Sequence, residues 1–244
     1  MKKIFFYLLI GGLTFTSCNK NDDPIDEADV ELDAPTQNSY DDEAIATFLE
    51  ENYFDEKGNV KEFSETDSTD NHYPKLSTLN PVKLSSGVVY IVREGAQPIN
   101  GEIIKPTDSL KMMVNAKTYK GVKDADNKYS LKFLLPFRNT MASGSFDIDP
   151  AYYYIVNEVL ENANTAESKL RSFYEIEGFK EGLTNFKAFS KEDEEDYNLQ
   201  GVIIVPSRAA FGKDPHYNFT GYAYKDRTFV FNFQVYKRFD RVKP

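Results

Sequence analysis

The sequence predicts an α+β domain in which an antiparallel sheet wraps around one short helix. Apolar residues alternate with mostly polar ones over residues 110–117, and the same period returns over residues 229–236. A period of two indicates strands with one buried face. Between these stretches, Phe179, Leu183 and Phe186 recur at the spacing of one helical face. A sheet with one short helix against it accommodates all three patterns.

The first predicted element is an amphipathic helix over residues 41–54, because four apolar residues fall on one face there. They are Ile45, Phe48, Leu49 and Tyr53. Residues 55–71 are polar and indicate a loop. The folded core is expected to begin near Lys83, so residues 41–82 form a helix and a linker ahead of it.

Three more strands are predicted from β-branched and apolar stretches. They cover residues 87–93, 127–137 and 202–205. Pro136 ends the second of these or comes close to its end, because proline cannot donate to a sheet ladder. In the closing strand, one face carries Phe229, Phe231, Phe233 and Val235.

A second helix is predicted over about residues 150–162. Asp149 and Pro150 are a helix-start signal, with aspartate as the cap and proline in the first turn. The apolar residues that follow fall on one helical face: Ile155, Val156, Val159 and Leu160. This helix is expected to be an addition to the basic sheet-and-helix domain.

The N-terminus has the pattern of a signal peptide over residues 1–17. Lys2 and Lys3 precede an apolar run over residues 4–13, which is too short to span a bilayer. A small residue directly before Cys18 resembles a bacterial lipoprotein cleavage site and implies a membrane anchor through lipid on Cys18. An ordinary secretory signal with an incidental cysteine is the alternative. Cys18 is the only cysteine, so no intramolecular disulfide forms.

Residues 18–40 are expected to form a flexible acidic tether, because such a stretch buries too little apolar surface to fold. Its Asp22-Asp23 pair resembles the surface-export signal of Bacteroidetes lipoproteins, although a plain solvated linker explains it equally well. We therefore expect a cell-envelope protein, in the outer membrane and either periplasmic or surface-exposed. The formal charge of −10 argues against nucleic acid as a partner.

Three segments near the C-terminus carry a family resemblance. They cover residues 176–183, 205–212 and 229–235, and in this order they resemble the C-terminal half of an FKBP-type peptidyl-prolyl isomerase. Weaker similarity upstream, at residues 86–95 and 107–114, extends the FKBP-like domain to residues 83–240. A segment of about residues 122–174 is then an insertion that includes the predicted extra helix.

The resemblance implies an apolar, proline-binding bowl that needs no cofactor and no metal. It implies catalytic roles for Phe179, Phe211 and Phe231, and substrate-binding roles for Ile176, Val205, Ala223 and Val114. Rotation about a prolyl bond has a barrier of about 18–20 kcal/mol because amide resonance must be broken. The twisted amide has less charge separation than the planar one, so an apolar pocket favours it.

Several positions depart from the family pattern. Phe211 stands where a tyrosine hydroxyl is usual, Val114 replaces another pocket tyrosine, and Glu175 lies where apolar residues line the pocket. Ala223 opens a stretch that replaces the usual Ile-Pro-Pro. For the family's Phe-Asp pair, the candidate is Phe146-Asp147.

Two functions follow from these observations. The first is a peptidyl-prolyl isomerase that assists the folding of exported envelope proteins and takes proline-containing segments as partners. The second is a catalytically inactive FKBP-like binding module in an outer-membrane or cell-surface complex. The resemblance favours an enzyme, while the altered site positions favour the binding module. A metal site is not expected, because His72 and His216 lie far apart without ligand spacing around them.

Overall fold

A computed structural model describes residues 31–216 and 223–242. These residues belong to one compact unit, Glu31–Pro244. The predicted signal peptide, Cys18 and the first part of the acidic tether lie outside the described residues. Within the described part of the chain, no helix combines the length and the apolar character needed to cross a membrane.

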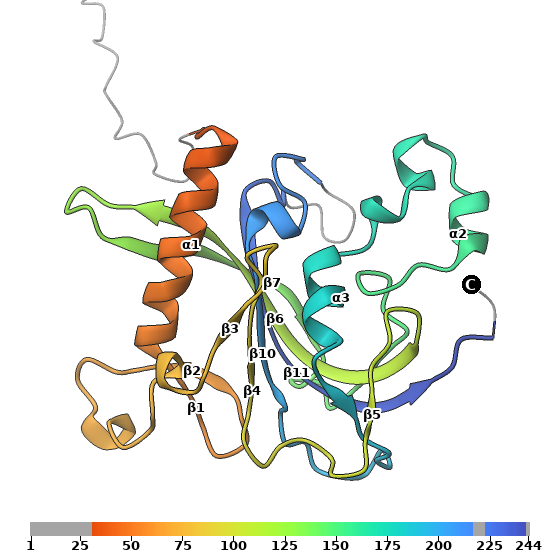
Figure 1. The fold of residues 1–244 in the computed structure, drawn as a ribbon, viewed down its shortest axis with the longest axis horizontal. Helices are drawn as coiled ribbons and strands as arrows, with labels where there is room; N and C mark the ends of the chain where they lie inside the picture. The colour runs from red at the N-terminus through yellow and green to blue at the C-terminus, as the bar shows by residue number, and fades with distance from the viewer. Residues whose placement is uncertain (1–30, 217–222, 243–244) are drawn as a thin grey trace, which may run out of the picture. The chain divides into compact units, whose positions relative to one another are not determined.

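The domain is mixed α/β, with a seven-stranded antiparallel sheet at its centre (Figure 1). Across this sheet the strands are β3 (Val82–Lys83), β4 (Val89–Val92), β10 (Gly201–Val205), β11 (Arg227–Phe239), β6 (Ser109–Lys123) and β7 (Tyr129–Asn139). The short strand β8 (Asp147–Ile148) also pairs with β6. Because β10 and β11 lie between β4 and β6, strands distant in the chain become neighbours.

The longest pairing joins β11 to β6, with Phe231 opposite Ala116 and Phe233 opposite Val114. The remaining strands form two smaller sheets of two strands each. One pairs β1 (Asn52–Phe54) with β2 (Val60–Glu62), and the other pairs β5 (Glu102–Ile103) with β9 (Lys187–Ala188). The 3-10 helices are η2 (Ser68–Asp70), η3 (Leu76–Thr78), η4 (Glu167–Lys169), η5 (Arg171–Phe173) and η6 (Ser207–Ala209).

One face of the sheet packs against the short helix α3 (Glu177–Leu183), and the predicted strand faces are confirmed there (Figure 1). This core contains the alternating residues of β6 and β11, namely Leu110, Met112, Val114, Ala116, Phe229, Phe231, Phe233 and Val235. From the helix it contains Phe179 and Leu183, followed by Phe186.

The other face is covered by α1 (Ala34–Glu51), which begins seven residues earlier than predicted. Asp33 caps it by accepting a hydrogen bond from the Thr36 N–H at 2.8 Å, and a proline lies in its first turn. Residues ahead of Lys83 supply half of the core on this face, among them Ile45, Phe48 and Leu76. The expectation of a core that starts near Lys83 is therefore wrong.

The helix predicted over residues 150–162 is also corrected. Within residues 150–162, only α2 (Asn157–Glu161) is an α-helix in the structure, and none of its residues is buried. The N–H groups of Tyr153 and Tyr154 both donate to the Pro150 carbonyl, which closes a single turn. The next N–H, of Ile155, donates at 2.9 Å to the carboxylate of Glu175 instead of continuing the helix.

Candidate functional site

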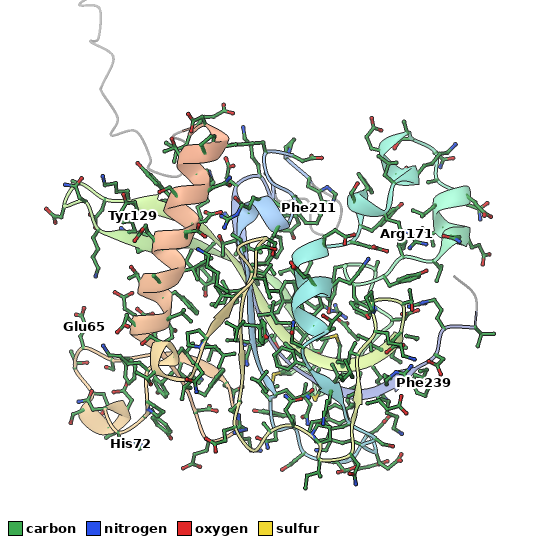
Figure 2. The ribbon with its side chains drawn as sticks, in the orientation of Figure 1. Glu65, His72, Tyr129, Arg171, Phe211 and Phe239 are labelled. Atoms are coloured by element: carbon green, nitrogen blue, oxygen red, sulfur yellow. The ribbon has the colours of Figure 1, made fainter. Side chains whose placement is uncertain are left out.

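Six of the seven residues predicted to form the pocket lie in the core between α3 and the sheet. Phe179 lies on α3, Phe231 on β11, Val205 at the end of β10 and Val114 on β6, while Ile176 caps α3 and Phe211 follows η6. Figure 2 shows Phe211 beside η6. Ala223 is exposed and does not join this cluster.

The rings of Phe179 and Phe231 stack, with centroids 4.1 Å apart and planes 24° apart. Gly178 lets the helix come this close, because a Cβ there would lie 2.5 Å from a methyl carbon of Val205. Phe179 and Phe231 are both fully buried. The helix and the sheet therefore bring together two of the three predicted catalytic rings.

Phe211 reaches the same cluster through Phe229, whose ring centroid lies 5.8 Å away. It stacks face to face on His216, with centroids 3.9 Å apart, and is 8% exposed. Burial lowers the pKa of His216, which keeps the imidazole neutral near pH 7. Phe211 offers no hydroxyl, so this part of the cluster is apolar stacking.

Helix α1 holds the loop that carries Phe211. The carboxylate of Asp41 accepts a hydrogen bond from the Ser207 N–H at 2.8 Å and another from the Gln37 amide at 2.8 Å. Asp41 is fully buried, and this burial raises the pKa of its carboxyl group. A residue from the N-terminal region, outside the expected domain, thus helps to position a predicted site loop.

The sequence did not single out Tyr152 of the insertion, whose ring lies against the predicted floor. Its centroid is 5.9 Å from that of Phe231, with planes 28° apart, and 5.8 Å from that of Phe179. Phe137 on β7 closes the group at 5.4 Å from Tyr152 and 6.0 Å from Phe231. The run of three tyrosines shortly after Pro150 is visible in the sequence. The sequence does not show which part of the fold these rings pack against.

The hydroxyl of Tyr152 links the ring cluster to a polar group at its edge, formed by Asp147 and Arg138. We call this group the polar corner of the cluster. The Tyr152 hydroxyl donates to a carboxylate oxygen of Asp147 at 2.7 Å, and the Arg138 Nε donates to the two carboxylate oxygens at 2.7 and 3.0 Å. Burial, then the charge of Asp147, raises the pKa of Tyr152 well above its usual value. The phenol therefore remains a neutral donor. Asp147 belongs to the pair that the sequence proposed for the family's Phe-Asp position.

The backbone of Tyr152 makes a second contact at the site. The N–H of Ile176, the residue before α3, donates to the Tyr152 carbonyl at 2.8 Å. That hydrogen bond uses a backbone donor that stands three residues before Phe179. The ring of Tyr152 thus lies against the apolar floor, and its carbonyl accepts from the backbone N–H at the start of α3.

The resemblance implies an apolar, pocket-lining residue at position 175, but Glu175 instead forms buried ion pairs and a hydrogen bond. Its side chain is fully buried, pairs with Arg171 at 2.9 Å and also with Lys180, and accepts the Ile155 N–H. Figure 2 shows Arg171 on the inserted segment. Glu175 therefore fastens the insertion to the start of α3, which holds the neighbouring Tyr152 segment over the site.

The described residues contain no group of three or more His, Cys, Asp or Glu side chains that could hold a metal ion. Fold and cluster define a mixed α/β domain with a mostly antiparallel sheet and an aromatic core around one short helix.

No family model matches this chain, and no curated protein matches it. Among solved structures, the crystal structure of FkpA from Escherichia coli is 23% identical, with a TM-score of 0.34. The match covers 67% of this chain and 52% of that chain, so it spans about half the length of FkpA.

Proposed function

We propose that this protein is a lipid-anchored, FKBP-like binding module of the cell envelope that does not catalyse prolyl isomerisation. The mostly antiparallel sheet with one short helix against it is compatible with an FKBP-like fold. The lipoprotein-like start with Cys18 supports attachment to a membrane. An acidic tether of like charges repels itself and extends, which would space the domain from that membrane.

One observation supports the absence of catalysis: the ring of Tyr152 lies against the predicted floor of the site. A catalytic pocket must contact the twisted prolyl amide more favourably than the planar one. Here the ring of Tyr152 already contacts Phe179 and Phe231, and its carbonyl already accepts the Ile176 N–H. A prolyl ring that entered this floor would have to displace the tyrosine and leave the Asp147 carboxylate without its hydroxyl donor.

The second candidate is the isomerase itself, and the polar corner of the cluster favours it. Asp147 lies beside an assembled floor of stacked rings and is 5% exposed. If Tyr152 left the floor, an apolar bowl with a carboxylate at its edge would remain. Proline-containing segments of exported proteins would then be the substrates.

Mild cross-linking of the full chain in its native membrane, followed by solubilisation and purification, tests the binding module. The proposal expects one envelope protein in constant ratio to this chain, and it expects the same partner after Phe179→Ala. A chain that purifies alone contradicts the binding module. Loss of the partner after Phe179→Ala would place the binding at the ring cluster and favour the isomerase candidate.

A further inference from the structure

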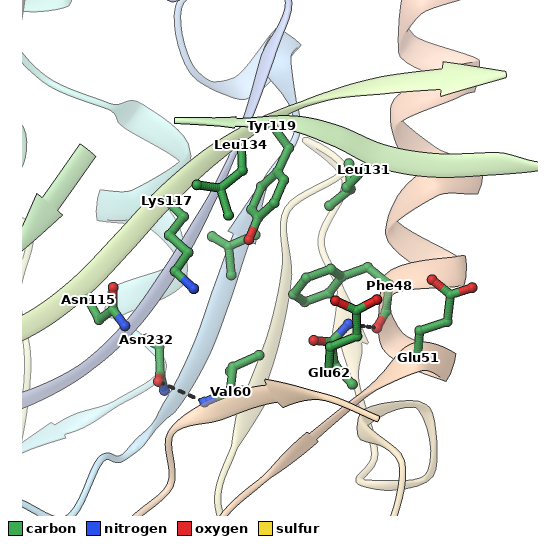
Figure 3. A pocket seen from close by; sticks show the side chains of 12 residues that line it. Phe48, Glu51, Val60, Glu62, Asn115, Lys117, Tyr119, Leu131, Leu134 and Asn232 are labelled. Carbon is green, nitrogen blue, oxygen red and sulfur yellow. Dashed lines mark hydrogen bonds between the residues drawn. The ribbon is translucent and has the colours of Figure 1, made fainter. Parts of the chain in front are cut away.

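A cavity of about 180 Å³ lies on the opposite face of the sheet, below α1 and beside β2 (Figure 3). Its walls come from elements far apart in the sequence, because α1 and β2 precede the sheet strands β6, β7 and β11 that form its floor. An engineered cavity of about 150 Å³ takes a benzene molecule, so this one has room for a compact organic ligand. It shares no lining residue with the ring cluster around Phe179.

The floor of the cavity carries a row of polar side chains. Asn115, Lys117 and Tyr119 alternate along β6 and therefore point to the same side. Nearer β4, the same face carries Val89, Ile91, Val202, Ile204 and Val230. The floor therefore offers three hydrogen-bonding side chains in one row.

Lys117 is half-buried, and Figure 3 shows its ammonium group directed into the cavity. Among the residues that the structure describes, it has no ion pair and no side-chain hydrogen bond. Burial, with a smaller contribution from the charge of Glu62, raises the pKa of the neighbouring Tyr119 to about 12. The Tyr119 hydroxyl therefore keeps its proton and can donate beside the ammonium.

A carboxylate stands on the other side of the cavity. Glu62 of β2 is exposed to solvent at the rim and lies across from Lys117 in Figure 3; within the described part of the chain it has no ion-pair partner. The second glutamate of the wall, Glu51, is already paired with Lys128 at 3.1 Å. One cation and one anion without partners thus face the same small space.

Apart from Asn52 and Asn232, the remaining walls are apolar. They include Phe48, whose ring centroid lies 6.1 Å from that of Tyr119, together with Leu131 and Val230. Leu134 is 50% exposed and stands beside Tyr119 in Figure 3.

We propose that this cavity binds a free α-amino acid with an apolar side chain. Lys117 and Tyr119 hold the carboxylate, Glu62 holds the ammonium group, and Phe48, Leu131 and Val230 contact the side chain. A zwitterion pairs with both charges at once, whereas a simple carboxylate can pair only with Lys117 and a simple amine only with Glu62. The inference is independent of the proposed function, because it concerns a different face of the sheet.

Calorimetric titration of the full chain with L-phenylalanine and L-leucine tests this site, with 3-phenylpropanoate and phenethylamine as ligands that lack one charge each. Saturable binding of at least one amino acid is expected. The two single-charge ligands are expected to bind about 10-fold or more weakly than L-phenylalanine, because each loses a charge-assisted hydrogen bond.

Variants complete the test. Lys117→Met is expected to weaken amino-acid binding about 10-fold or more, while Lys123→Met, on the same strand but outside the cavity lining, leaves it unchanged. If neither amino acid binds to the folded protein, or if 3-phenylpropanoate binds as tightly as L-phenylalanine, the zwitterion site is refuted. Equal effects of the two lysine substitutions would refute it as well, because they would indicate general surface electrostatics.

Discussion

The ring of Tyr152 stacks on the ring of Phe231, with centroids 5.9 Å apart and planes 28° apart. Phe231 belongs to the closing strand and Tyr152 to the insertion, so this contact joins the additional segment to the centre of the sheet. With the hydrogen bond from the Ile176 N–H to the Tyr152 carbonyl, it fixes the inserted residue at the site.

Tyr152→Ala is expected to lower the free energy of unfolding by about 3–5 kcal/mol, because it removes a buried aromatic ring and leaves a cavity. Tyr152→Phe keeps the ring and removes only the hydroxyl donor to buried Asp147, for an expected loss of about 1–3 kcal/mol. Chemical denaturation measures both. Equal losses for the two variants would contradict a role of the ring in filling the site.

The same Tyr152→Ala change is expected to admit a proline-containing peptide to the ring cluster. A short proline-containing peptide is titrated into the wild type and into the variant, and the NMR signals of the protein's aromatic side chains are recorded. Chemical-shift changes that saturate with peptide concentration are expected in the variant alone. The double variant Tyr152→Ala, Phe179→Ala supplies the control and should lose them. Shifts of the same size in the wild type would mean that Tyr152 does not block the floor.

Glu175→Ala is expected to cost about 3–5 kcal/mol, because it leaves Lys180 and the Ile155 N–H without their buried partner. Hydrogen exchange at Ile155 should accelerate, since that N–H donates to the removed carboxylate. Glu177→Ala is a matched control: its side chain is 65% exposed and pairs with the same lysine at 3.5 Å. Its expected effect stays within about 0.5 kcal/mol, and a larger loss there than at Glu175 would overturn the assignment.

His216 predicts a pH dependence of stability. Burial lowers its pKa below the ordinary value of 6.5, so the unfolded chain takes up a proton before the folded one as the pH falls. Its contribution is complete above the unfolded pKa and declines as the pH falls through 6.5 toward the lower folded value. The unfolding free energy of the wild type minus that of His216→Gln should therefore be larger at pH 7.5 than at pH 5.5. A difference that is constant or grows at low pH would show that the imidazole is not protected from protonation.

Local patterns in the sequence were sufficient for the central sheet and for α3. The alternation of Leu110, Met112 and Val114 reports a buried face directly, because the side-chain period of a strand is two. Phe179 and Leu183 likewise share a helix face.

Long-range contacts set the parts that sequence did not predict. The start of α1 was missed because residues 34–40 show no apolar period and were assigned to the tether, whereas in the structure they are helical and buried Gln37 donates to the Gly121 carbonyl at 3.0 Å. The expected helix after Asp149 is interrupted because Glu175, distant in the chain, takes the Ile155 N–H. The position of Tyr152 depends on Asp147 and Ile176 in the same way, and no local spacing encodes it.

The rate of cis/trans exchange in a short X-Pro peptide, measured by NMR with the full chain present, tests the central claim most directly. The account predicts that the wild type leaves this rate equal to the rate in buffer alone and that Phe179→Ala changes nothing. Acceleration by the wild type that Phe179→Ala removes would show that the ring cluster is a working isomerase site, and it would contradict the proposal that Tyr152 fills it.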